Sequence, residues 1–89
     1  MSDSYLEVTY RHGHPVAAYY YLPRKSGDKS HGTKRIDPGL IIDLSRSGRP
    51  IGIEITAPGK ITLAGLNRVF ARFGLQRVSR DEIAPLLAA

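Results

Sequence analysis

The segment that most constrains the fold of this chain of 89 residues is 39–55. Apolar side chains alternate with polar or small ones along two runs, 40–44 and 51–55, and a Ser-Arg-Ser-Gly segment lies between the runs. Because successive side chains of a strand point to opposite faces, each run predicts a strand with one aliphatic face. The pattern predicts a β-hairpin whose core face is formed by Leu40, Ile42, Leu44, Ile51, Ile53 and Ile55.

The turn of this hairpin is compatible with two geometries. Gly48 suits a type I turn that ends in a β-bulge, whereas matching the apolar faces of the two strands requires an even loop length. We expect the match between the apolar faces to decide the register.

Two more strands are predicted nearer the N-terminus. Residues 5–10 alternate between apolar and polar side chains, and residues 16–22 are rich in the aromatic and small apolar types that suit a sheet. Residues 23–38 predict a long polar loop; an extended lead-in at 34–36 is the alternative, because Pro38 favours extended backbone before it.

The last third of the chain has helical spacing. Thr62 is expected to cap a helix whose apolar stripe stops at Gly74, and Ser79 with Glu82 forms a capping box for a second helical turn that Pro85 is expected to cut short. The stripe consists of Leu63, Leu66, Val69, Phe70 and Phe73. We therefore predict a single α+β domain over 1–89: a four-stranded antiparallel β-meander over 5–56, and a C-terminal segment over 62–88 that packs one amphipathic helix on one sheet face and ends in a short helical turn.

Composition limits the classes of function. The formal net charge is +5, from thirteen basic and eight acidic residues, which biases the surface toward acidic or phosphate-bearing partners. The chain has no cysteine, so disulfides and thiolate metal sites are excluded. Because no secretory leader and no apolar run of about 18 residues is found, we expect a cytoplasmic protein that does not bind membranes.

The strand pattern resembles the bacterial domain-of-unknown-function family 2283 over Tyr5 to Ala57. The resemblance rests on Ala18-Tyr-Tyr-Tyr-Leu22, on Pro38-Gly-Leu-Ile-Ile-Asp-Leu44 and on the spacing of Asp43, Gly48, Gly52 and Glu54. Members are small and have no established activity; some lie beside genes for toxin-like proteins, so the resemblance implies an antitoxin role for some. This chain has Arg11-His-Gly-His-Pro15 where an acidic segment is usual in the family, so a role of those acids is not carried over.

One predicted sheet face combines tyrosines with carboxylates. This face is too apolar to be left exposed to solvent, and tyrosine is common in protein interfaces. We expect this face to bind a second copy in a homodimer or another protein partner, without catalysis and without a cofactor or metal ion. Gly52 is expected to mark the close approach of a ring or a partner chain. The predicted face consists of Tyr5, Tyr19, Tyr21, Ile41, Asp43, Gly52 and Glu54.

Three alternatives stay open. A nucleic-acid-binding accessory protein would use the basic loop residues Arg24, Lys25, Lys29, Lys34 and Arg35. An enzyme or metal site would use Asp43 and Glu54 as a carboxylate pair. Zinc or nickel would be bound by His12 and His14, with His31 in the loop as a further candidate.

Overall fold

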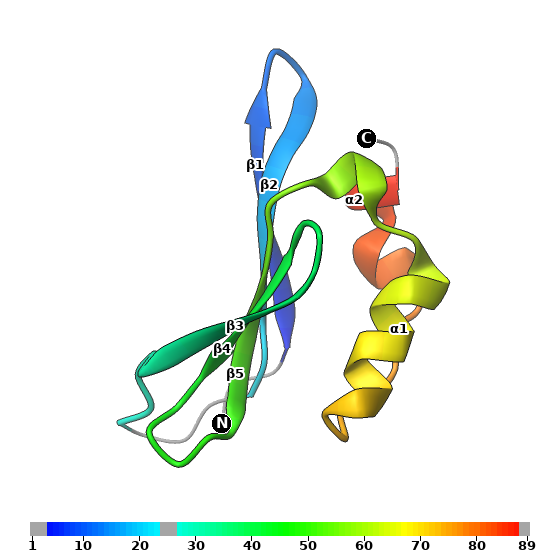
Figure 1. Cartoon of the computed structure of the whole chain (residues 1–89). Helices are drawn as coiled ribbons and strands as arrows, with labels where there is room; N and C mark the ends of the chain where they lie inside the picture. The colour runs from blue at the N-terminus through cyan, green and yellow to red at the C-terminus, as the bar shows by residue number, and fades with distance from the viewer. Residues whose placement is uncertain (1–3, 24–26, 88–89) are drawn as a thin grey trace.

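The computed structural model describes residues 4–23 and 27–87 and shows an α+β fold, a sheet with helices on one side (Figure 1). The strands are β1 (Tyr5–Arg11), β2 (His14–Tyr21), β3 (Gly32–Asp37), β4 (Leu40–Leu44) and β5 (Pro50–Ile55). The helices are α1 (Leu63–Arg72) and α2 (Ala84–Leu87), preceded by 3₁₀ turns at Pro58–Lys60 and Asp81–Ile83 respectively. The predicted fold class and the antiparallel sheet are confirmed.

The predicted four-stranded meander is wrong in strand number and in order. The sheet has five strands in the order β1-β2-β5-β4-β3, so β2 pairs with β5 and not with the strand that follows it. The isoleucines of β5 explain this placement, because all three are fully buried and a central strand has neighbours on both sides. The polar β3 lies at an edge, where its charged side chains reach water.

The additional strand β3 lies in the predicted polar loop. It forms a hairpin with β4, in which Asp37 pairs with Leu40 and the two turn residues are Pro38 and Gly39. Gly39 has a φ of +87°, and Pro followed by Gly at these positions is typical of a type II turn. The alternative of extended backbone at 34–36 is therefore correct, and the strand begins two residues earlier, at Gly32.

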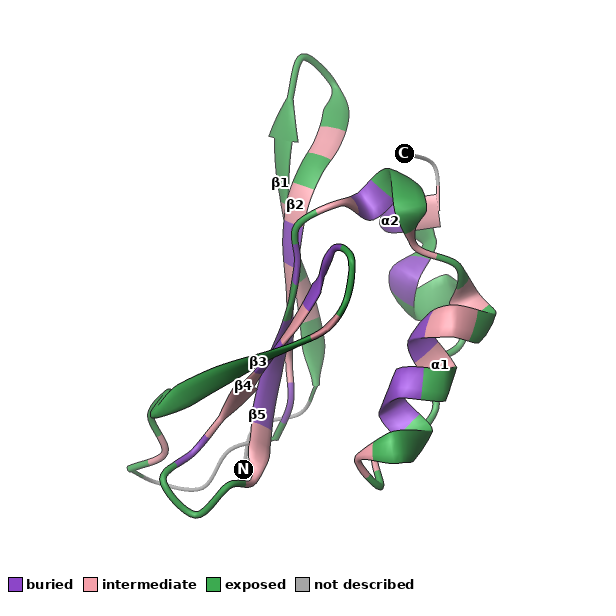
Figure 2. Cartoon of the chain, in the orientation of Figure 1, coloured by how far each residue is buried: buried purple, intermediate pink, exposed green. Residues whose placement is uncertain are grey.

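The core lies between the inner face of the sheet and α1 (Figure 2). Phe70 of α1 is 1% exposed, and its ring centroid lies 5.5 Å from that of Tyr20 on β2. Toward the tip of the β1–β2 hairpin the apolar side chains are not covered: Val16 is 43% exposed and Tyr10 is 55% exposed. The hairpin extends past the helices, and no element of the described residues packs on its tip.

The β4–β5 hairpin combines the two geometries considered for its turn. Gly48 has a φ of +86° and donates its N–H to the carbonyl of Ser45 at 2.9 Å. Ile42 nevertheless pairs with Ile53, because the register shifts by one residue before Leu44 pairs with Pro50. The bulge absorbs the extra residue and keeps the apolar faces matched, as expected.

The predicted helix signals are present. The Thr62 hydroxyl accepts the N–H of Gly65 at 3.0 Å, and Gly74, with a φ of +69°, lies beyond the C-terminus of α1, where the N–H of Leu75 reaches the carbonyl of Phe70 at 2.9 Å. This is the Schellman arrangement. Pro85 does not end the second helix. It is the second residue of α2, where a missing N–H costs little.

The connector between α1 and α2 is fixed by a side chain that the sequence did not single out. Asn67 donates its amide to the carbonyl of Val78 at 3.1 Å and accepts the N–H of Val78 at 2.8 Å. The capping box is formed by the Ser79 N–H to Glu82 at 3.1 Å and the Glu82 N–H to the Ser79 hydroxyl at 3.3 Å. These bonds hold residues 78–82 against the helical layer.

Candidate functional site

The outer face of the sheet, on the side away from the helices, carries two cross-strand rows of side chains. We call the rows the tyrosine row and the charged row. From β1 to β3 the tyrosine row is Tyr5, Tyr21, Gly52, Asp43 and Thr33, and the charged row is Glu7, Tyr19, Glu54, Ile41 and Arg35. The structure thus brings all seven residues of the predicted binding face together in these two rows.

The tyrosines form one cluster. The rings of Tyr5 and Tyr21 stack at a centroid distance of 4.4 Å with planes 12° apart, and the Tyr19 ring lies 4.6 Å from that of Tyr21. The Tyr21 hydroxyl donates to Glu7 at 3.1 Å. Tyr5 stays 55% exposed, so the cluster presents aromatic surface to the solvent.

Gly52 provides the space for the Tyr19 ring. A Cβ at Gly52 would overlap the Tyr19 hydroxyl and ring carbons, so the ring lies flat across the backbone of β5. From there its hydroxyl donates to Asp43 on β4 at 2.5 Å, a short bond of the kind expected for a carboxylate acceptor. Of the two close approaches expected at Gly52, the structure shows that of a ring.

The two carboxylates proposed as an acid/base pair have different environments. Asp43 is half-buried and accepts the Tyr19 hydroxyl, whereas Glu54 is exposed on the neighbouring strand, between Tyr19 and Ile41 in the charged row. The hydrogen bond of Asp43 gives this carboxylate a structural role, that of holding the Tyr19 ring across β5.

The three described residues among the basic ones proposed for nucleic-acid binding, Lys29, Lys34 and Arg35, do not form one surface. Arg24 and Lys25 lie outside the described residues. Lys34 pairs with Ile42 of the inner face and Arg35 with Ile41 of the outer face, so these two neighbours in β3 point to opposite sides of the sheet. Lys29 lines a cleft beside the β4–β5 turn.

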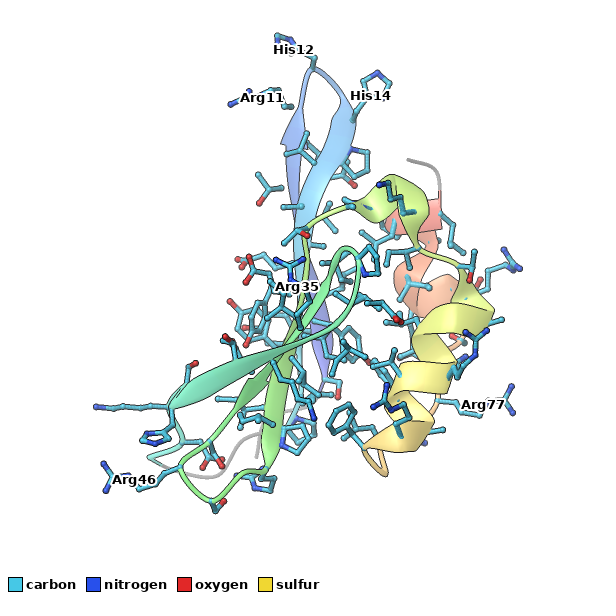
Figure 3. All side chains as sticks on the ribbon, viewed as in Figure 1. Arg11, His12, His14, Arg35, Arg46 and Arg77 are labelled. Atoms are coloured by element: carbon cyan, nitrogen blue, oxygen red, sulfur yellow. The ribbon has the colours of Figure 1, made fainter. Side chains whose placement is uncertain are left out.

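The histidines lie at two distant places. His12 and His14 are at the tip of the β1–β2 hairpin, where His12 has a φ of +53°, and His31 lines the same cleft as Arg46, at the other end of the sheet (Figure 3). Within residues 4–23 and 27–87, no three histidine, cysteine, aspartate or glutamate side chains gather in a way that could hold a metal ion.

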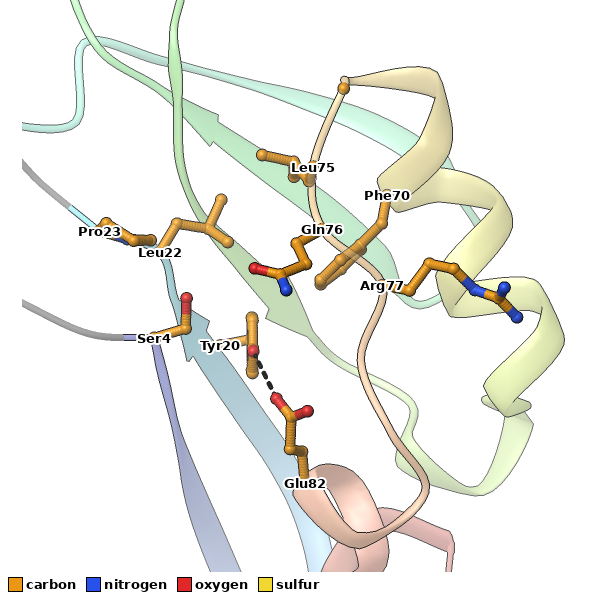
Figure 4. Close-up of a pocket in the computed structure, with 10 residues that line it drawn as sticks. Ser4, Tyr20, Leu22, Pro23, Phe70, Leu75, Gln76, Arg77 and Glu82 are labelled. Atoms are coloured by element: carbon orange, nitrogen blue, oxygen red, sulfur yellow. Dashed lines mark hydrogen bonds between the residues drawn. The ribbon is translucent and has the colours of Figure 1, made fainter.

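A second concave region lies between the sheet and the connector of the two helices (Figure 4). This cavity of about 430 Å³ is lined by polar groups of Gln76, Arg77 and Glu82 and by the rings of Tyr20 and Phe70. The Tyr20 hydroxyl donates to Glu82 at 3.3 Å. Burial raises the pKa of Tyr20, and the backbone N–H of Ser79 lowers the pKa of Glu82. The sequence predicted Glu82 as a cap, but the approach of Tyr20 is a tertiary contact without a local signal.

Comparison with known proteins gives no match: no family model, no curated protein and no solved structure is similar to this chain. Among the helices of the described residues, none has the length and apolar composition needed to cross a lipid bilayer. The geometry of the outer face is therefore the basis for the function proposed next.

Proposed function

We propose that this chain is a non-enzymatic interaction protein that forms a homodimer by packing the outer face of its sheet against the same face of a second copy. The observation that carries the proposal is the cluster of three tyrosine rings on this face, of which Tyr5 is 55% exposed. The helices cover only the inner face, while the outer face has stacked rings at one edge and the half-buried Ile41 toward the other. Apolar and aromatic area of this kind favours association with another surface.

The charges of the outer face favour a second copy as the partner. Glu7 and Arg35 occupy opposite ends of the charged row, on the two edge strands. A two-fold axis parallel to the strands and passing over β5 reverses the row in the second copy. It therefore places Glu7 of each copy opposite Arg35 of the other, and Tyr19 opposite Ile41. On both sides of the central Glu54 the row is self-complementary, as the interface of a two-fold dimer requires.

The same symmetry brings the two Glu54 carboxylates together at the axis. Glu54 is exposed in the single chain, so its charge is solvated there and meets its copy only in the dimer. Like charges at such a position weaken association. The homodimer therefore predicts that neutralising Glu54 strengthens association, whereas a basic protein partner would predict the opposite.

The size of the face sets the expected strength. Five strands spaced about 4.8 Å apart give a row about 19 Å long, and two such faces bury an area at the low end of specific interfaces. Association is therefore expected to depend on concentration in the micromolar range, and sedimentation equilibrium over a wide concentration range is the appropriate measurement.

A charge exchange tests the geometry. Glu7→Arg and Arg35→Glu each create two like-charged pairs across the axis, so either variant alone should be monomeric. An equimolar mixture should recover the dimer, because each pair then joins opposite charges. Arg77→Glu, on the connector behind the helices, is the control for a general charge effect and should still dimerise. A wild-type chain that stays monomeric at millimolar concentration, or a mixture no more associated than its two components, would overturn the proposal.

A further inference from the structure

A cleft at the far end of the sheet has the composition of an anion site. It lies between the segment 27–31 and the turn of the β4–β5 hairpin, and its volume is about 650 Å³. Arg46, at its rim, points outward from the turn, far from the tip of the β1–β2 hairpin (Figure 3). Besides Asp28, the polar side chains that line the cleft are Lys29, Ser30, His31, Ser45, Arg46 and Ser47.

The carboxylate in this cleft is already neutralised. Asp28 forms an ion pair with Arg49, and its side chain is only 16% exposed. Lys29 and Arg46 are both exposed, so two positive charges face the cleft. Among the described residues that line it, Asp28 is the acidic one, and its carboxylate has a cationic partner. The local charge therefore favours an anionic ligand.

Both walls of the cleft are fixed to the sheet. The N–H of His31 reaches the carbonyl of Leu44 at 2.8 Å, which attaches the 27–31 segment to the end of β4. Ser45 is 5% exposed; its hydroxyl accepts the N–H of Arg49 at 3.2 Å and lies 3.0 Å from the hydroxyl of Ser47. The Ser45 and Ser47 hydroxyls are thus held in place before a ligand arrives, and the backbone that carries the two cations is attached to the sheet, which lowers the entropic cost of binding.

We propose that this cleft binds a phosphate group. Phosphate offers several acceptor oxygens at high charge density, and lysine, arginine and hydroxyl side chains are its usual donors. The cleft has room for more than one phosphate. The described residues that line it include no tyrosine or phenylalanine on which a base could stack, so recognition is directed to the phosphate and not to a nucleobase. The phosphate can belong to a small phosphorylated molecule or to the backbone of a nucleic acid.

Titration with two probes tests the proposal and separates the sources. Inorganic pyrophosphate and a twelve-nucleotide single-stranded DNA are each titrated into the ¹⁵N-labelled full chain at 50 mM salt, and amide shifts are followed. We expect saturable shifts confined to 27–31 and 44–49. Lys29→Gln and Arg46→Gln should each weaken binding at least tenfold, and the circular dichroism spectrum should stay unchanged. The matched control is Arg77→Gln, which removes the same charge on the opposite side of the molecule and should leave binding within twofold.

The outcomes divide clearly. Binding of pyrophosphate with this variant pattern supports the cleft as a site for a small phosphorylated ligand. Binding of the DNA alone, with the same variant pattern, supports it as a site for a nucleic-acid phosphate. Failure of both probes to bind overturns the proposal, and so does an equal loss of affinity in Arg46→Gln and Arg77→Gln, which would mean attraction to the overall charge of +5. These variants leave the two outer rows intact, so the result is independent of dimer formation.

Discussion

Replacing Gly52 by alanine is expected to displace the Tyr19 ring from β5. The new Cβ would occupy the position of the ring and its hydroxyl, and the neighbouring backbone belongs to a central strand that is paired on both sides. The ring is the part that can move, because rotation about its side-chain bonds swings it away from the sheet. This movement breaks the hydrogen bond to Asp43.

The magnitude follows from three contributions. Loss of a hydrogen bond to a charged group costs about 1.5–3 kcal/mol. Loss of about 40 Å² of ring contact with the β5 backbone costs about 1 kcal/mol more. Against this, alanine is intrinsically better than glycine in a strand by about 0.5–1 kcal/mol. The net loss is about 1.5–3.5 kcal/mol, compared with a total stability of roughly 4–13 kcal/mol for a domain of this length.

A double-mutant cycle isolates this effect. Urea unfolding followed by far-ultraviolet circular dichroism suits a chain without tryptophan, and it would give the free energy of unfolding of wild type, Gly52→Ala, Tyr19→Ala and the double variant. In the Tyr19→Ala background the ring is absent, so Gly52→Ala should be neutral or slightly stabilising. The same cost of Gly52→Ala in both backgrounds would refute the role assigned to the ring.

Other predictions concern the helical layer. The pKa of Glu82 is lowered from its ordinary value of 4.5. The stability that Glu82 contributes is therefore present above pH 4.5 and is lost as the pH falls through the folded-state pKa. Glu82→Gln should flatten the acid side of a plot of melting temperature against pH. The pKa of Tyr20 is raised from 10.0. The stability that Tyr20 contributes is therefore complete below pH 10 and is lost as the pH rises through the folded-state pKa. Tyr20→Phe should flatten the alkaline side of the same plot. Asn67→Ala leaves two backbone groups of Val78 without their side-chain partner and should lower the free energy of urea unfolding by about 2–3 kcal/mol. Gly74→Ala, at a positive φ with open space around it, should cost about 1 kcal/mol by the same measurement, and no change would contradict the conformational argument.

The local features of the fold could be predicted from the sequence. Alternation identified the strands around Ile42 and Ile53, and the signals at Thr62, Gly74 and Ser79 identified the helix ends, because each depends on residues a few positions apart. Grouping Tyr19 with Asp43 on one face also followed from the period of two in strands.

The remaining features depend on tertiary competition. The pairing of β2 with β5 gives Ile53 neighbours on both sides, and no local pattern encodes which strand takes the central position in the sheet. The polar composition of β3 favours a loop, although the turn at Asp37-Pro38-Gly39 is a local signal for a hairpin and is sufficient to identify the strand. The phosphate cleft joins Lys29 to Arg46, which are brought together only when β3 and β4 pair.

The central position of β5 has a consequence for synthesis on the ribosome. The β1–β2 and β3–β4 hairpins each close through a short turn, so both can form while later residues are still being translated. Of the five strands, β5, which joins the two hairpins, is translated last. Until residue 55 emerges from the ribosome, the edge of β2 at Ala18 and Tyr20 lacks the strand with which it pairs. The nascent chain therefore exposes an unpaired strand edge, and a fragment that stops before residue 50 should aggregate. In the 89-residue chain, β5 pairs with this edge.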